Sequence, residues 1–256
     1  MLKIGPFQFK SNLVLGTGKY KNFQMMKEAL DISGTDLVTV AIRRIDMNAP
    51  KGKGLLDFLD LKKYKLLPNT AGCFNVEDAI LTARLAREAL NTNLIKLEVI
   101  GDKFSLWPDM EQTLTAAKIL IAEGFVVMPY CGPDPVTARK LEEIGCHAVM
   151  PLASPIGSGL GIQDKETLSI VRKSITKVPM IVDAGVGTAS DAAVAMELGA
   201  DGVLMNTAIA EAKNPVLMAE AMKYSVMAGE IAFKAGRMPK KFSADPSSPT
   251  KGVPGS

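Results

Sequence analysis

The sequence is poor in residues that bind metals or form disulfide bonds. Its 256 residues include one histidine, His147, and three widely spaced cysteines, Cys73, Cys131 and Cys146, with no CxxC pair. A structural zinc site needs about four such ligands at short spacing. We therefore expect three reduced thiols, no metal site and no other bound cofactor.

The sequence also lacks charge clusters and long apolar runs. Lys and Arg total 30 and Asp and Glu total 27, a net charge of +3, and they are interleaved along the chain. Nucleic acids and anionic membranes attract basic blocks, and a membrane span needs about 18 apolar residues. The first residues show no signal-peptide pattern. We expect a cytoplasmic protein with a small anionic substrate.

What the chain does contain is a regular alternation of apolar runs and segments with helical periodicity. This alternation is typical of βα units that build a parallel sheet. It predicts one domain, an α/β (βα)8 TIM barrel with eight parallel strands, over residues 1–236; an open doubly wound sheet is the alternative because its local signals are the same. The eight runs begin at residues 13, 35, 64, 93, 125, 147, 179 and 200.

Helix ends are marked by capping residues. Asn75, Asp134 and Asn214 are expected N-caps, the last two followed by proline, and glycines at 124, 145 and 199 are expected to end helices in left-handed geometry.

Residues 237–256 are rich in Pro, Ser, Gly and Lys without apolar periodicity. We expect them to form a flexible C-terminal tail that could order over a bound partner.

The fourth run, NLIKLEVIG, carries an unusual pair of charges. Lys96 and Glu98 are two apart in a strand and share one face, while Ile95, Leu97 and Val99 share the other. In a barrel the charged face points inward, where burial is expected to lower the lysine pKa. A neutral amine can form an imine with a ketone, and Glu98 would serve as acid or base. The alternatives are a structural ion pair or a wet strand face.

The seventh and eighth runs end in features that suit an anion. Asp183 lies near the end of its strand and is followed by Gly185, Gly187 and the start of a helix, and the next run ends in Asn206 and Thr207. Glycine lets backbone amides approach a phosphate, helix N-termini favour anions, and barrels often bind phosphate after strands seven and eight. The pattern favours a phosphorylated substrate over mere tight turns.

The loop after the sixth run holds Gly157, Gly159 and Gly161 and suits a backbone contact with ligand or a mobile lid; a featureless connection is the alternative. Arg43 and Arg44 end the second strand at the same rim, where one could hold a substrate anion or pair with an acid.

Three other features carry no expected role in catalysis. The GTGKY segment at 16–20 lacks the spacing of a nucleotide-binding loop. His147 begins the sixth strand, at the barrel edge that serves stability. Cys131 lies near a strand end but has no partner residue.

Longer motifs resemble one family. The segments VLGTGKY, LLPNTAG, IKLEVIG, MPLASPIGSGLGI and IVDAGVGTASDAAVAMELGADGVLMNTAIA, in this order from about Leu13 to about Gly236, closely resemble bacterial thiazole synthases of thiamine biosynthesis. The resemblance implies a (βα)8 barrel that joins 1-deoxy-D-xylulose 5-phosphate, dehydroglycine (2-iminoacetate) and sulfur from a carrier protein with a C-terminal thiocarboxylate. We also expect a homo-oligomer.

The resemblance further implies roles for particular residues. Lys96 would form the imine with the sugar ketone, and Glu98 and Asp183 would transfer protons. The sugar phosphate would contact Gly157, Ala184, Gly185, Asn206 and Thr207. Two rival interpretations stay open: a class I aldolase acting on a sugar phosphate, and a noncatalytic protein that binds the sulfur carrier.

Overall fold

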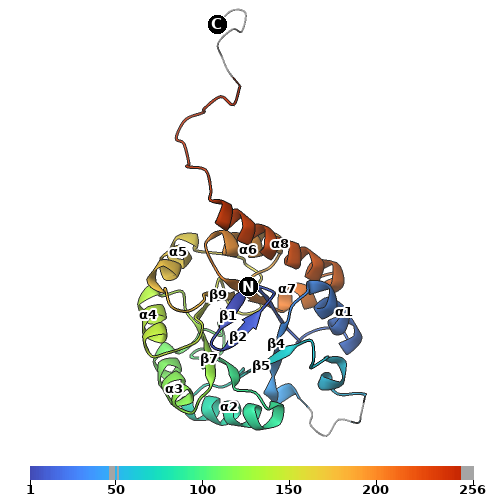
Figure 1. Cartoon of the computed structure of the whole chain (residues 1–256). Coiled ribbons are helices and arrows are strands. Elements are labelled where there is room, and N and C mark those ends of the chain that lie inside the picture. Colours follow the sequence, from blue (N-terminus) through green and yellow to red (C-terminus); the bar gives the residue numbers. More distant parts are fainter. Residues whose placement is uncertain (46–49, 51, 249–256) are drawn as a thin grey trace, which may run out of the picture.

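The sheet closes into a barrel. The computed structural model describes residues 1–45, 50 and 52–248, and Figure 1 views it with helices ringing the strands. Eight parallel strands follow the order β8-β7-β6-β5-β4-β3-β10-β9. The two ends of this order meet. The amide of Ile181 donates to the carbonyl of Val149, and the amide of Val149 donates to the carbonyl of Pro179, both at 3.0 Å. The predicted barrel is confirmed, and the open-sheet alternative is wrong.

Each of the eight predicted runs contains one strand. The barrel strands are β3 (Leu13–Gly16), β4 (Leu37–Ala41), β5 (Lys65–Asn69), β6 (Leu94–Leu97), β7 (Val126–Cys131), β8 (Met150–Pro151), β9 (Ile181–Asp183) and β10 (Gly202–Met205). The helices are α1 (Phe23–Ser33), α2 (Val76–Leu90), α3 (Met110–Ala122), α4 (Pro135–Glu143), α5 (Lys165–Ser174), α6 (Ala189–Glu197), α7 (Thr207–Ala210) and α8 (Pro215–Ala235).

The connection from β4 to β5 departs from the βα repeat. Its described residues contain only two 3-10 turns, η1 (Ile42–Arg44) and η2 (Leu55–Phe58). The other barrel strands are each followed by an α-helix. The rim beside β4 is therefore built from irregular chain, and Leu55 of η2 reaches the cavity described below.

An N-terminal hairpin closes the bottom of the barrel. β1 (Leu2–Ile4) pairs antiparallel with β2 (Phe7–Phe9), and the hairpin lies across the middle of the ring in Figure 1. Leu2, Ile4 and Phe9 are buried with inward side chains of the barrel strands. The hairpin thereby removes the lower barrel layer from water, which leaves the opposite end for a site.

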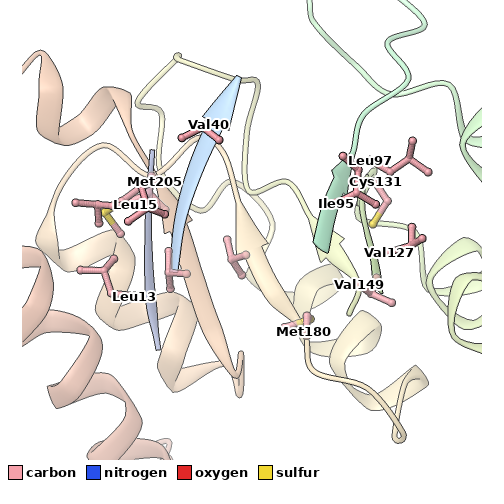
Figure 2. Close-up of a cluster of buried hydrophobic side chains, with 14 of the residues drawn as sticks. Leu13, Leu15, Val40, Ile95, Leu97, Val127, Cys131, Val149, Met180 and Met205 are labelled. Carbon is pink, nitrogen blue, oxygen red and sulfur yellow. The ribbon is translucent and has the colours of Figure 1, made fainter. Parts of the chain in front are cut away.

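The two faces of each strand bury different layers. Side chains on the outer face pack against the helices, and Figure 2 shows this layer with Leu13, Val40, Ile95, Leu97 and Val127 among its members. The inner face carries the second layer, which includes Val14, Leu37, Leu67, Leu94, Met128, Ile181 and Leu204. The alternation places Lys96 on the inner face, as the sequence predicted.

Helix ends follow the sequence signals. The side chains of Asn75, Asp134 and Asn214 accept amide hydrogen bonds at the starts of α2, α4 and α8. The φ angles of the glycines at 124, 145 and 199 are 82°, 94° and 93°, all left-handed. These caps and stops are confirmed, and they set where each helix returns the chain to the next strand.

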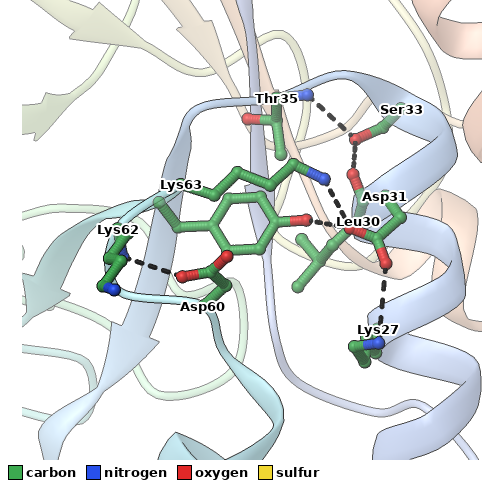
Figure 3. Close-up of polar contacts among 9 residues, drawn as sticks. Lys27, Leu30, Asp31, Ser33, Thr35, Asp60, Lys62 and Lys63 are labelled. Carbon is green, nitrogen blue, oxygen red and sulfur yellow. Dashed lines mark hydrogen bonds and ion pairs between the residues drawn. The ribbon is translucent and has the colours of Figure 1, made fainter.

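A polar network ties α1 to the chain before β5. The Tyr64 hydroxyl donates to Asp31 Oδ1 at 2.7 Å, Lys63 contacts the same carboxylate, and Lys27 lies 3.9 Å away (Figure 3). Exposed ion pairs contribute roughly 0–1 kcal/mol each. The network therefore orients α1, while apolar packing supplies most of the stability here.

Beyond α8, residues 237–248 form no helix or strand and are exposed, and in Figure 1 they run away from the barrel. The flexible tail over 237–256 stays a prediction, and its last eight residues lie outside the described part. No helix in the described ranges has the length and apolar character to cross a membrane.

Candidate active site

A large cavity opens at the carboxyl ends of the barrel strands, opposite the hairpin. Its volume is about 920 Å³. In (βα)8 barrels this end carries the active site. The wall includes all the residues to which the resemblance gave a catalytic or substrate-binding role: Lys96, Glu98, Gly157, Asp183, Ala184, Gly185, Asn206 and Thr207.

One amine and two carboxylates meet inside the barrel. Lys96 Nζ lies 2.7 Å from Asp183 Oδ2 and 3.3 Å from Glu98 Oε1. The side chains of Lys96 and Glu98 are each 7% exposed, and that of Asp183 is 2% exposed. Because β6 and β9 are not neighbours in the sheet, the contact between Lys96 and Asp183 spans the barrel interior. The ammonium therefore points into the barrel interior and not into bulk solvent.

The charges of this trio depend on each other. Burial alone would lower the pKa of Lys96, but the nearby carboxylates of Asp183 and Glu98 outweigh burial and hold that pKa above its ordinary value. Burial raises the pKa of Asp183 to about 6, although the ammonium of Lys96 acts against this rise. The expectation of a lowered lysine pKa is thus wrong, because it did not include Asp183. The resting amine is protonated and must pass a proton on before it can act as a nucleophile.

Two residues that the sequence analysis did not assign surround the trio. The Thr70 hydroxyl donates to the carbonyl of Glu98 and accepts from its amide, both at 2.7 Å, which fixes the backbone after β6. The ring of Tyr130 is fully buried, and its centroid lies 5.8 Å from Lys96 Nζ. Thr70 lies within LLPNTAG and Tyr130 faces inward by strand alternation, so both signals were present in the sequence.

The loop after β9 is pressed against the loop after β8. Ala184 and Gly185 have φ angles of 77° and 82°, and a side chain at Gly185 would lie 2.1 Å from Ser154 Oγ. The amide of Gly161 donates to the carbonyl of Gly185 at 2.8 Å. Left-handed geometry at a non-glycine residue such as Ala184 is strained and is often found at functional sites. The two loops therefore form one packed wall of backbone, which favours a fixed ligand contact over a lid.

The turn that leads into α6 is bonded to a carboxylate of that helix. The amides of Gly187 and Thr188 both donate to Asp191 Oδ2 at 3.0 Å. Asp191 thus satisfies two amides that precede α6, and the expectation that this helix start faces an anion stays a prediction. At α7, in contrast, the N-cap Asn206 makes no side-chain cap bond, and its buried Oδ1 has no hydrogen-bond partner. The amides of Ile209 and Ala210 donate to the carbonyl of Asn206 at 3.0 and 2.9 Å. The amide of Thr207, the first of α7, has no acceptor within its own helix and can donate to a ligand.

The two arginines at the rim differ in surroundings. Arg43 donates to the carbonyl of Gly72 at 2.9 Å and to Cys73 Sγ at 3.4 Å, so it holds the loop after β5. Arg44 also lines the cavity and lies against Gly18, where an added side chain would come within 2.9 Å of its Nη1. Arg44 is thus the better placed of the two to reach a substrate.

The remaining candidate residues lie outside the cavity. His147 Nδ1 accepts from the amide of Val127 at 3.2 Å, and its ring lies beside Gly5 of the hairpin, in agreement with a structural role. Cys131 is buried in the outer layer, and burial raises its pKa. All three cysteines are free and buried. In the described part of the chain, no three His, Cys, Asp or Glu side chains gather so as to hold a metal ion.

Fold and site together define a class. A closed (βα)8 barrel with a polar cavity at its carboxyl end is the architecture of a barrel enzyme. The family model described as "Thiazole biosynthesis protein ThiG" matches residues 3–249. The chain belongs to this family, the bacterial thiazole synthases, and the family expected from the motifs is confirmed.

Curated relatives agree over nearly the whole length. The chain is 58% identical to a thiazole synthase of Aquifex aeolicus over 253 residues, which cover 99% of this chain and 94% of the relative. It is 60% identical to a thiazole synthase of Maricaulis maris over 245 residues, covering 96% and 91%. The resemblance therefore includes every strand and loop of the cavity.

Solved structures support the same fold. A crystal structure of the Amycolatopsis orientalis BexX/CysO complex contains a chain that matches with a TM-score of 0.85 and 34% identity, covering 94% of this chain and 98% of that one. A 3-hexulose-6-phosphate synthase of Salmonella typhimurium matches with a TM-score of 0.56 and 18% identity, covering 84% and 98%. At that identity the second match concerns the fold alone.

Proposed function

We propose that this enzyme builds the thiazole phosphate carboxylate precursor of thiamine through an imine on Lys96. Its inputs are 1-deoxy-D-xylulose 5-phosphate, dehydroglycine and sulfur from a carrier protein with a C-terminal thiocarboxylate. The observation that carries this proposal is the buried contact of Lys96 Nζ with Asp183 at 2.7 Å and Glu98 at 3.3 Å. A buried amine between two proton acceptors is suited to imine chemistry.

The first step needs a neutral amine. Asp183 takes the proton of Lys96, since its pKa of about 6 makes it a stronger base than an ordinary aspartate. The freed amine adds to the sugar ketone, and loss of water leaves a C=N bond. The imine draws electrons from the neighbouring carbon, whose proton is then removed.

The enamine formed in this way moves the carbonyl one position along the sugar, and the sulfur nucleophile adds there. Glu98 lies on the same strand face as Lys96 and within reach of the same atoms. It therefore serves as the acid or base for the steps that follow imine formation. No redox partner is required for these steps.

The phosphate of the sugar is placed in the backbone wall beside the trio. Gly157, Ala184 and Gly185 line the cavity in left-handed geometry, and Asn206 and Thr207 begin α7. Short helices after the last barrel strand are common phosphate sites. Five contacts from three loops would fix the ketone carbon over Lys96.

The partner and the assembly belong to the same proposal. The solved relative was crystallised in complex with a second protein, CysO, which supports a protein partner for this chain. Exposed apolar side chains on α8, Leu217, Tyr224, Met227 and Ile231, recur at helical spacing and suit contact with a second copy of the chain. We place the reaction in the cytoplasm.

Reconstitution from purified components tests the proposal. With the sugar phosphate, dehydroglycine and thiocarboxylated carrier, we expect thiazole product, and none when the thiocarboxylate is replaced by the carboxylate. Cleavage of the sugar phosphate without the carrier would favour the aldolase instead. Carrier binding without any product would favour the noncatalytic protein.

A further inference from the structure

A second lysine lies beside the proposed phosphate seat. Lys19 Nζ would lie 3.6 Å from a side-chain carbon placed on Gly157, and Thr207 Oγ1 would lie 3.9 Å from the same point. Lys19, Gly157 and Thr207 all line the cavity. The amine therefore adjoins two residues that the proposed function assigns to the phosphate.

The backbone holds Lys19 in an unusual conformation. Its φ is 67°, in the left-handed region that favours glycine. On one side the Thr17 hydroxyl donates to the carbonyl of Thr39 at 3.0 Å, and on the other side the hydroxyl of Tyr20 is buried. Strain of this kind persists only where the surroundings impose it, and it clusters at ligand-binding sites. The loop thus holds Lys19 at the rim of the cavity, where its side chain is 44% exposed.

In this structure Lys19 pairs with Glu211. The distance between Nζ and Oε1 is 3.0 Å, and the two side chains are 44% and 56% exposed. Glu211 follows α7 and is four residues after Thr207, so both lie on one side of that helical turn. A half-exposed pair of this kind is weak and is easily exchanged for a stronger anion.

A cation beside the seat would strengthen its hold on a phosphate dianion. Lys96 is already engaged by two carboxylates, and Arg43 is engaged by the loop after β5. Arg44 lies against Gly18. Lys19 is the cation that adjoins Gly157, where the backbone wall meets α7.

We propose that Lys19 binds the phosphate of the sugar substrate and exchanges its contact with Glu211 for that phosphate. This rests on the proposed function, because it takes the phosphorylated ketose as the ligand. It adds a charged side chain to a seat otherwise made of backbone and two small polar residues. Lys19 then distinguishes the phosphate ester from the free sugar.

The test is borohydride trapping on the full chain at increasing sugar concentrations. For Lys19→Met we expect the concentration of 1-deoxy-D-xylulose 5-phosphate at half-maximal trapping to rise about 10- to 100-fold, the range of a charge-assisted hydrogen bond. The value for unphosphorylated 1-deoxy-D-xylulose should not change. Lys19→Arg should recover most of the affinity, and Lys21→Met, an exposed lysine outside the cavity wall, should match wild type.

Two further variants separate binding from folding. Lys19→Gly suits the left-handed backbone and should lose affinity as Lys19→Met does, without loss of stability. Glu211→Gln removes the competing anion and should lower the half-maximal concentration a few-fold. Two results would overturn the proposal and show a structural ion pair. One is an equal rise in the half-maximal concentration for both sugars in Lys19→Met, and the other is an affinity of Glu211→Gln as low as that of Lys19→Met.

A second ligand keeps the two proposals apart. If wild-type protein forms no trapped adduct, the imine mechanism fails. The role of Lys19 is then tested by measuring the binding of inorganic phosphate alone. Calorimetry should find phosphate binding to wild type that Lys19→Met weakens by the same factor. Equal phosphate affinity in both would refute the role of Lys19.

Discussion

Lys96 owes its chemistry to its neighbours. With Asp183 at 2.7 Å and Glu98 at 3.3 Å, the ammonium is stabilised in a cavity where an isolated charge would be very costly. The same neighbours supply the bases that remove its proton. Asp183 and Glu98 thus stabilise the charged amine before the ketone binds, and one of them removes its proton when the imine forms.

The role of Glu98 is tested by removing its charge at constant shape. We expect Glu98→Gln to keep imine formation, because Asp183 remains to take the lysine proton. Thiazole turnover should fall by roughly 10²- to 10⁴-fold, the usual factor for a general acid or base. Rate measurements on the reconstituted reaction check this, and unchanged turnover would remove Glu98 from the mechanism.

The raised pKa of Asp183 predicts a pH dependence. Above its pKa of about 6 the carboxylate is ionised and can accept the proton of Lys96; below it the carboxylate is already protonated. The rate of adduct trapping should therefore fall as the pH drops through about 6. In Asp183→Asn the rate of adduct trapping should be low at every pH, and the fall in rate near pH 6 should be absent. A step that persists in the Asn variant would assign it to another group.

At the scale of elements, the site depends on loops that pack backbone against backbone. Gly185 lies against Ser154, and Gly187 lies against Gly159, where an added side chain would come within 2.2 Å of the carbonyl oxygen. Such contacts leave no room for side chains. The glycines after β8 and β9 are therefore required first for the fit of two loops, and that fit shapes the wall offered to a phosphate.

A pair of matched glycines tests this fit. Gly185 and Gly124 share a φ of 82°, but only Gly124 has open space around a new side chain. Gly124→Ala should lose about 1–2 kcal/mol of unfolding free energy from backbone strain alone. Gly185→Ala should lose about 2–5 kcal/mol because overpacking adds to strain, and it should bind the sugar phosphate more weakly. Equal losses in urea unfolding would contradict the packing argument.

Much of the site followed from local pattern, and the remainder did not. Strand alternation placed Lys96 and Glu98 on the inner face, and the caps at Asn75 and Asn214 are confirmed. The contact with Asp183 depends on closure of the barrel, which joins residues far apart in the chain. The direction of the Lys96 pKa therefore could not follow from one strand. The capping of α6 by Asp191, in contrast, was not predicted although Thr188 and Asp191 match the S/T-x-x-D/E pattern of a capping box.

For the molecule as a whole, the two ends of the barrel have separate tasks. The hairpin of β1 and β2 seals the lower layer with buried apolar side chains, while polar groups gather at the other end. This hairpin was not predicted, although the apolar runs on either side of Gly5 and Pro6 are its signal in the sequence. Stability and chemistry are thus separated along the barrel axis.

This separation predicts that hairpin variants change stability more than chemistry. Phe9 is 2% exposed beneath the barrel, so Phe9→Ala should lose about 3–5 kcal/mol of unfolding free energy. Gln8→Ala, an exposed neighbour on the same strand, should change it by less than about 0.5 kcal/mol. The folded Phe9→Ala protein should retain wild-type affinity for the sugar phosphate. A large loss of affinity would show that the two ends are coupled.

The most direct test of the account is mass spectrometry of the protein after borohydride reduction in the presence of 1-deoxy-D-xylulose 5-phosphate. We predict one stable adduct with the mass of the reduced sugar phosphate, located on the peptide that contains Lys96, and none in a folded Lys96→Ala variant. A wild-type protein that stays unmodified, or an adduct on a different lysine, would contradict the imine mechanism.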